Sequence, residues 1–311
     1  MPDKNRNFAA LFKYLSNLMQ KYLVILLSMT FLFISGCSPT LKISKNEQAK
    51  QAFEAGKLEK SLQLYEEIIA TEEAAGALAE GNHYEEAGKT AEALGDMTKA
   101  ESYYKLAIYY KTASADVYQK LARYYRQQDN ISKESGMLEP LLNLFPKSEQ
   151  AKAEKTRLYQ IYIETEQWEK AVALWPPNAG SAQDENLLGT YFAAQKKLGN
   201  DEKVDELSAA LLKLNPENKA ALEWKAIALY NKGENRYQKE LQDYESNKTR
   251  RQYKIMLDGL DVSTASFRDA LKIFEKLYKQ ESNKTYALYI ANIYARFGDE
   301  ANAKRYQKLS Q

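Results

Sequence analysis

The chain repeats one order of aromatic, small and Gly-Asp residues along most of its length. The order is plainest in residues 286–299, which end in Gly298 and Asp299. The second half of each unit begins near a position that usually holds a small residue. Aligned on this position, the chain shows seven copies, at Ser61, Ala100, Glu134, Ala171, Val204, Ala270 and Ala303. Successive spacings are 39, 34, 37, 33, 66 and 33 residues. Such a period indicates stacked supersecondary units, here about six to seven with one insertion.

The composition favours helices within each unit. Only 13 glycines and 7 prolines occur in 311 residues, while Ala, Leu, Glu and Lys, which are strong helix formers, are abundant. Pro146 and Pro216 stand where the second helix of a unit should end, because proline cannot continue a helix. The sequence therefore predicts an all-α chain of stacked helical hairpins.

The repeated order resembles the tetratricopeptide repeat, a helix-turn-helix of about 34 residues. Three stretches carry the resemblance best, 84–107, 118–146 and 286–303. It implies a helical solenoid in which Gly88 and Ala122 lie where two helices approach closely. It also implies that the first helices line a concave face that holds extended peptides or a partner's helix. Carried over, the candidate groove residues are Lys89, Gln119, Arg123, Arg126, Gln160, Lys196, Lys197 and Tyr230.

The pattern also predicts how the chain is divided. One group of repeats spans residues 46–175, a polar joint spans 176–185, and a second group spans 186–311, with uncertain repeat boundaries around 176–200. Residues 235–266 form a charged, helix-forming insertion between the two helices of the penultimate unit. We expect this insertion to pack against the solenoid, with its tip at 248–251 exposed.

Before the repeats stands a segment with the features of a secretory signal. Four cationic residues precede an apolar run at 22–35, which is too short to span a bilayer stably. Residues 34–37, Ile-Ser-Gly-Cys, resemble the lipobox of bacterial lipoproteins. The resemblance implies that residues 1–36 are removed, that Cys37 is lipidated, and that 37–45 form a tether. The same resemblance implies the outer membrane, because Ser38 follows the cysteine. A buried structural cysteine is the alternative, and translation could begin at Met1 or Met19.

The remaining motifs point away from catalysis. Residues 87–90, Ala-Gly-Lys-Thr, look like the end of a phosphate-binding loop, but His83 occupies the position where that loop needs a glycine. His83 is the only histidine, which excludes zinc sites built from two histidines. Carboxylate pairs are not excluded by sequence. We predict no cofactor, no metal site and no enzymatic activity.

Charge argues against nucleic acid as a partner. The whole chain carries 44 basic and 42 acidic residues, of which the leader holds four basic and one acidic. The rest of the chain is therefore nearly neutral, with no basic footprint. We therefore predict a lipid-anchored scaffold that binds one or more envelope proteins, on the outer membrane facing the periplasm or on the cell surface, with a role in outer-membrane assembly or secretion. The alternative is a glycan- or peptide-binding lipoprotein that uses some of its 23 tyrosines.

Overall fold

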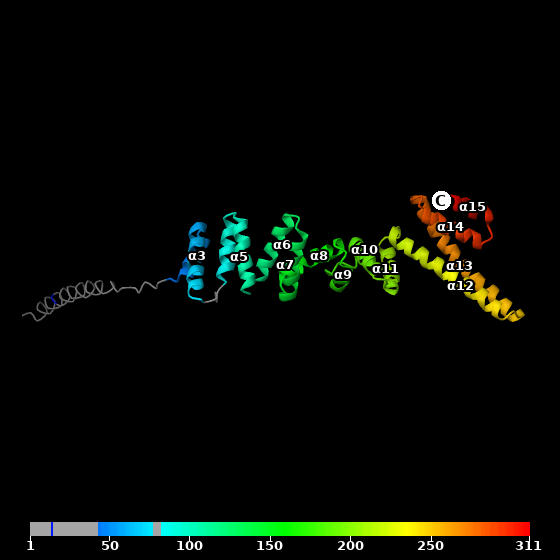
Figure 1. The fold of residues 1–311 in the computed structure, drawn as a ribbon, viewed down its shortest axis with the longest axis horizontal. Helices are drawn as coiled ribbons and strands as arrows, with labels where there is room; N and C mark the ends of the chain where they lie inside the picture. The colour runs from blue at the N-terminus through cyan, green and yellow to red at the C-terminus, as the bar shows by residue number, and fades with distance from the viewer. Residues whose placement is uncertain (1–13, 15–42, 77–81) are drawn as a thin grey trace, which may run out of the picture. The chain divides into compact units, whose positions relative to one another are not determined.

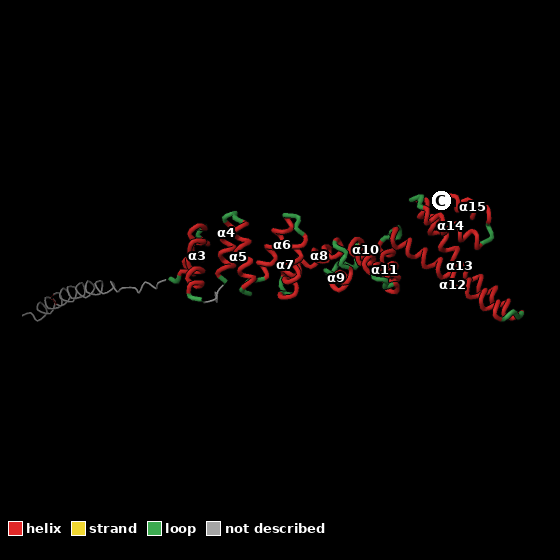
Figure 2. Tube along the Cα trace, in the orientation of Figure 1, coloured by secondary structure: helices red, strands yellow, loops and turns green. Residues whose placement is uncertain are grey.

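The computed structural model describes residues 14, 43–76 and 82–311. Within these ranges all regular secondary structure is α-helical, and no strand occurs (Figures 1 and 2). The helices are α2 (Lys45–Glu54), α3 (Leu58–Ala74), α4 (His83–Ala93), α5 (Met97–Tyr109), α6 (Ala115–Gln127), α7 (Ile131–Leu144), α8 (Glu149–Glu164), α9 (Trp168–Leu174), α10 (Glu185–Lys197), α11 (Asp201–Leu214), α12 (Lys219–Ser246), α13 (Arg250–Gln280), α14 (Lys284–Arg296) and α15 (Glu300–Leu309).

Consecutive helices pair into seven hairpins among the described residues, from α2–α3 to α14–α15. The predicted all-α solenoid of six to seven tetratricopeptide-like units is therefore confirmed. The described residues form two compact units, which divide between Thr112 and Ala113. Two hairpins belong to the first unit and five to the second.

In the first unit, a glycine lets two helices approach closely. A Cβ atom added to Gly88 of α4 would lie 2.6 Å from ring carbons of Tyr104 on α5. Tyr104 is fully buried, and its hydroxyl donates to Glu92 Oε2 at 2.7 Å. Gly88 is thus a helix-packing residue inside α4, as its place in the repeat predicts, and residues 87–90 are helical instead of forming a phosphate-binding loop.

In the second unit, two apolar clusters follow one another along the stack. One centres on Leu188, Phe192 and Leu211 from α10 and α11, and the other on Phe267, Phe274 and Ile290 from α13 and α14. Leu212 of α11 packs against both clusters. The short helix α9 has only seven residues and ends just before Pro176 and Pro177, in line with the break that the sequence predicts there.

The insertion is helical, as predicted, and it extends the two helices of the hairpin that it interrupts. It lengthens α12 to 28 residues and α13 to 31, so both helices continue as one long hairpin (Figure 1). The two helices pack on each other, closely at Gly233, where an added Cβ would lie 3.0 Å from the Phe267 ring. The turn lies at residues 247–249. The domain boundaries drawn from the sequence stay predictions.

Cys37 and the lipobox lie outside the described residues, so lipid attachment stays a prediction. In the part of the chain that the structure describes, no helix has the length and apolar character needed to cross a membrane.

Candidate binding groove between α11 and α12

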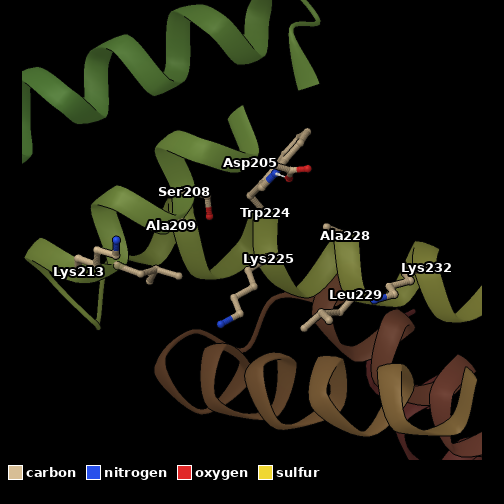
Figure 3. Close-up of a pocket in the computed structure, with 10 residues that line it drawn as sticks. Asp205, Ser208, Ala209, Lys213, Trp224, Lys225, Ala228, Leu229 and Lys232 are labelled. Carbon is tan, nitrogen blue, oxygen red and sulfur yellow. Dashed lines mark hydrogen bonds between the residues drawn. The ribbon is translucent and has the colours of Figure 1, made fainter. Parts of the chain in front are cut away.

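An open groove runs between the second helix of the fifth hairpin, α11, and the first helix of the sixth, α12 (Figure 3). Its volume is about 640 Å³. The lining side chains are Asp205, Ser208, Ala209, Leu212 and Lys213 on α11, and Trp224, Lys225, Ala228, Leu229 and Lys232 on α12. Both walls are therefore helices of the second compact unit.

The α11–α12 turn holds the two walls in place. Pro216 follows the end of α11, and Asn218 caps α12 by accepting a hydrogen bond from the Ala221 amide at 3.0 Å. The side-chain amides of Asn215 and Asn218 both donate to Glu185 Oε1 at 2.8 Å. Because these bonds tie the turn to α10, the angle between α11 and α12 is fixed at its closed end.

Two further bonds join the walls directly. The Ser208 hydroxyl donates to the Ala221 carbonyl at 3.0 Å, and both residues are buried. The Trp224 indole Nε1–H donates to Asp205 Oδ1 at 2.6 Å. Lys196 of α10 places its ammonium group 5.7 Å from the centre of the Trp224 ring. The groove is therefore formed before any ligand arrives, which lowers the entropy loss on binding.

A second hollow of about 560 Å³ continues along α12 to the base of the long hairpin. It is lined by Ala228, Asn231, Lys232, Asn235, Arg236 and Lys239 of α12, and by Val262 and Ser266 of α13. The two hollows share Ala228 and Lys232. We call the combined surface the α12 groove.

The rim of the α12 groove is basic. Among the described residues, Lys213, Lys225 and Lys232 are exposed and have no carboxylate within ion-pair distance. Arg236 pairs with Glu240 at 2.6 Å, and Lys239 lies 4.0 Å from Asp243. The one acidic residue of the lining, Asp205, accepts the Trp224 hydrogen bond.

The floor of the groove is apolar. Leu212 and Leu229 are partly buried, and Val262 is 51% exposed beside the second hollow. No group of three or more His, Cys, Asp or Glu side chains that could hold a metal ion occurs in the described part of the chain. The arrangement is suited to a ligand that combines negative charge with apolar groups.

None of the eight residues predicted from the resemblance lines the α12 groove. Two of them, Gln119 and Arg126, contact buried carboxylates. Gln119 is buried and donates to Glu154 Oε1 at 3.0 Å. Arg126 donates to Glu134 Oε1 and to Glu154 Oε2, each at 2.6 Å. Both side chains therefore bind buried carboxylates of α7 and α8, and partner binding by Gln119 and Arg126 stays a prediction.

The two glutamates belong to one charged cluster that joins α6, α7 and α8. Glu134 also accepts from Arg157 at 2.9 and 3.0 Å, and Glu154 accepts from Arg123 at 3.2 Å. Burial alone would raise the pKa of Glu134, but hydrogen bonds from Arg157 and Arg126 outweigh it and hold that pKa below its ordinary value. The pKa of Glu154 is likewise lowered, since Arg126 and Gln119 outweigh the effect of burial.

The other predicted residues lie in different surroundings. Lys89 pairs with Glu85 and Glu86 of its own helix at 2.8 and 3.0 Å. Tyr230 is partly buried and packs against Tyr289 and Phe267, with ring centres 4.9 and 5.6 Å apart. Gln160, Lys196 and Lys197 are exposed. Partner binding by these residues and by Arg123 stays a prediction.

Sequence reasoning missed the α12 groove, although one signal was present. Lys225, Lys232 and Lys239 recur every seven residues, a spacing that places side chains on one side of a helix. Small or apolar residues between them, Ala228 and Leu229, complete the pattern.

No protein-family model matches the chain, and no curated protein matches it in sequence. The solved structures to which the chain is similar include tetratricopeptide repeat proteins. A protein of Bacteroides ovatus is 17% identical, with 60% of this chain and 100% of that chain covered and a TM-score of 0.45. A tetratricopeptide repeat protein of Parabacteroides merdae is 17% identical, with 62% and 77% covered and a TM-score of 0.36. The C-terminal part of a TPR repeat-containing protein of Cytophaga hutchinsonii is 11% identical, with 85% and 93% covered and a TM-score of 0.39. Because these identities and scores are low, the tetratricopeptide-like assignment depends on the hairpins of the chain itself.

Proposed function

We propose that this protein is a scaffold that binds other proteins. The observation that supports this most directly is the α12 groove, a preformed, basic surface with an apolar floor on a stack of helical hairpins. Stacked repeats create extended surfaces that suit polypeptide partners. The groove residues offer charge and apolar contact, which are the means of recognition between proteins.

The finer part of the proposal concerns location. The signal-like segment and the Ile-Ser-Gly-Cys quartet support anchoring through lipid on Cys37 in a bacterial envelope. Several acyl chains give stable attachment, since each buried methylene contributes about 0.8 kcal/mol and one chain alone holds only marginally. The scaffold would then work at the outer membrane, on its periplasmic face or at the cell surface, in assembly or secretion.

Affinity purification of the intact, lipid-anchored chain from envelope extracts tests the scaffold function. We expect one protein at fixed stoichiometry, and its purified form should bind the purified chain again. If no protein is recovered but oligosaccharides bind saturably, the scaffold proposal fails. A glycan-binding lipoprotein is the second candidate, favoured by Tyr109, whose side chain is 76% exposed beside Tyr110.

The anchor has its own test. A Cys37→Ser variant should leave the membrane fraction while its circular dichroism stays helical, because the described hairpins begin only at Lys45. Fractionation of cells that express either form measures this. A variant that remains in the membrane fraction as fully as the natural chain would contradict lipid anchoring.

A further inference from the structure

We propose that the α12 groove binds an acidic segment of a partner polypeptide, with apolar side chains of that segment seated on Leu212, Leu229 and Val262. The proposal rests on the scaffold function and gives its partner a chemical class. It also places binding on a second helix, a first helix and the inserted hairpin, away from the surface that the first helices alone would form.

Charge complementarity selects an acidic occupant. Lys213, Lys225 and Lys232 have no acidic partner among the described residues, so their charges are available to a ligand. Lys225 and Lys232 are seven residues apart on α12, as are Lys232 and Lys239. At about 1.5 Å per residue, each step is about 10 Å. An extended segment with an acidic residue at every third position would match that spacing, since each of its residues spans about 3.3 Å.

The apolar floor selects a polypeptide over other polyanions. Nucleic acids gain affinity from bases that stack on aromatic rings, yet Trp224 is the only aromatic residue in the lining of either hollow. Its indole N–H is bonded to Asp205, and Lys196 faces its ring. Leu212, Leu229 and Val262 offer instead aliphatic surface, which matches Leu, Ile or Val side chains between the acidic residues of a peptide.

The length of the groove sets the length of the ligand. From Lys225 to Lys239 the helix α12 advances about 21 Å, at about 1.5 Å per residue. A fully extended peptide of about six or seven residues covers that distance. The expected ligand is therefore a short linear segment with two or three acidic residues.

Selection from a random peptide library displayed on phage, against the full chain, tests the proposal without presupposing a ligand sequence. We expect enriched peptides to combine Asp or Glu with aliphatic residues, and synthetic copies to bind with measurable affinity in fluorescence anisotropy. The variant K213E/K225E/K232E should weaken that binding at least ten-fold. All three lysines are exposed and unpaired, so the fold should persist, which circular dichroism checks.

Two further variants separate charge from shape and from nonspecific effects. Ala209→Trp places a large ring on an exposed position of the lining while every charge remains, and it should also weaken binding at least ten-fold. K60E/K147E/K308E changes three exposed lysines outside the groove, and it should bind like the natural chain at equal ionic strength.

Several results would overturn the proposal. These are an absence of enriched peptides, enriched peptides without net negative charge, equal loss of binding in the K60E/K147E/K308E control, or heparin displacing the peptide at lower concentration than the unlabelled peptide does. The scaffold function is judged separately. If an envelope partner is recovered equally by the natural chain and by K213E/K225E/K232E, the groove proposal fails while the scaffold function stands.

Discussion

Replacing Gly88 by alanine gives a sharp test of how the first unit is packed. In an open helix position the change stabilises a protein by about 1 kcal/mol, because glycine has the poorer helix propensity. Here the new Cβ would lie 2.6 Å from two ring carbons of Tyr104. Tyr104 is fully buried and its hydroxyl is bonded to Glu92, so the ring cannot move aside without loss of that bond.

Overpacking of this kind costs about 1–3 kcal/mol, and a trapped ring places Gly88→Ala at the upper end. After the gain in helix propensity is subtracted, we expect the free energy of unfolding to fall by about 2 kcal/mol. Gly136→Ala is the matched control, because Gly136 lies inside α7 with nothing within 4 Å of an added Cβ. The free energy of unfolding of that variant should rise by up to about 1 kcal/mol.

Urea denaturation followed by circular dichroism gives the two changes in free energy, and amide hydrogen exchange locates the loss in α4 and α5. A Gly88→Ala/Tyr104→Leu variant should lose less than the sum of its single changes, since leucine lacks the ring carbons that the methyl group meets. If Gly88→Ala is as stable as the natural chain while Gly136→Ala gains, the close approach of α4 and α5 is refuted.

The remaining predictions concern the second unit. Because the pKa values of Glu134 and Glu154 are lowered in the folded chain, their stabilising effect is complete above their unfolded pKa of about 4.3 and is lost as the pH falls through the lowered folded values. Urea midpoints between pH 7 and pH 3 should therefore fall less in an Arg126→Met variant than in the natural chain, and parallel curves would contradict this. Gly259→Ala should speed amide exchange in the distal part of the α12–α13 hairpin, because the Glu240 side chain occupies the space of the new Cβ; unchanged exchange there would show that the hairpin adapts.

The hairpins could be predicted from the sequence because their packing is local. Gly88 contacts a residue sixteen positions later, and a similar order of small and large residues recurs along the chain, so this local pattern suffices. The roles of Gln119 and Arg126 depend on Glu154, which lies 35 and 28 residues further on and resembles any surface acid. Only Glu134 indicated this charged cluster in the sequence. It stands at a repeat position that usually holds a small residue, and a charge there requires a buried counter-ion.

The groove could not be predicted because it depends on geometry that no repeat pattern carries. It exists where α12 separates from α11 and continues into the hairpin. The sequence predicted that residues 235–266 are helical, but periodicity alone does not distinguish two continuous long helices from a separate helical pair packed on the stack.

The long hairpin has a mechanical consequence. Beyond Gly233, α12 continues to Ser246, an arm of about 20 Å at about 1.5 Å per residue. A rotation of about 10° at its base would move the tip by about 3 Å on this length. The α12 groove lies at this fulcrum, with α11 on one side and the arm on the other. A ligand that bridges both sides would therefore restrict this rotation. A probe at the tip of the hairpin, at residues 247–249, would detect its binding as a loss of motion.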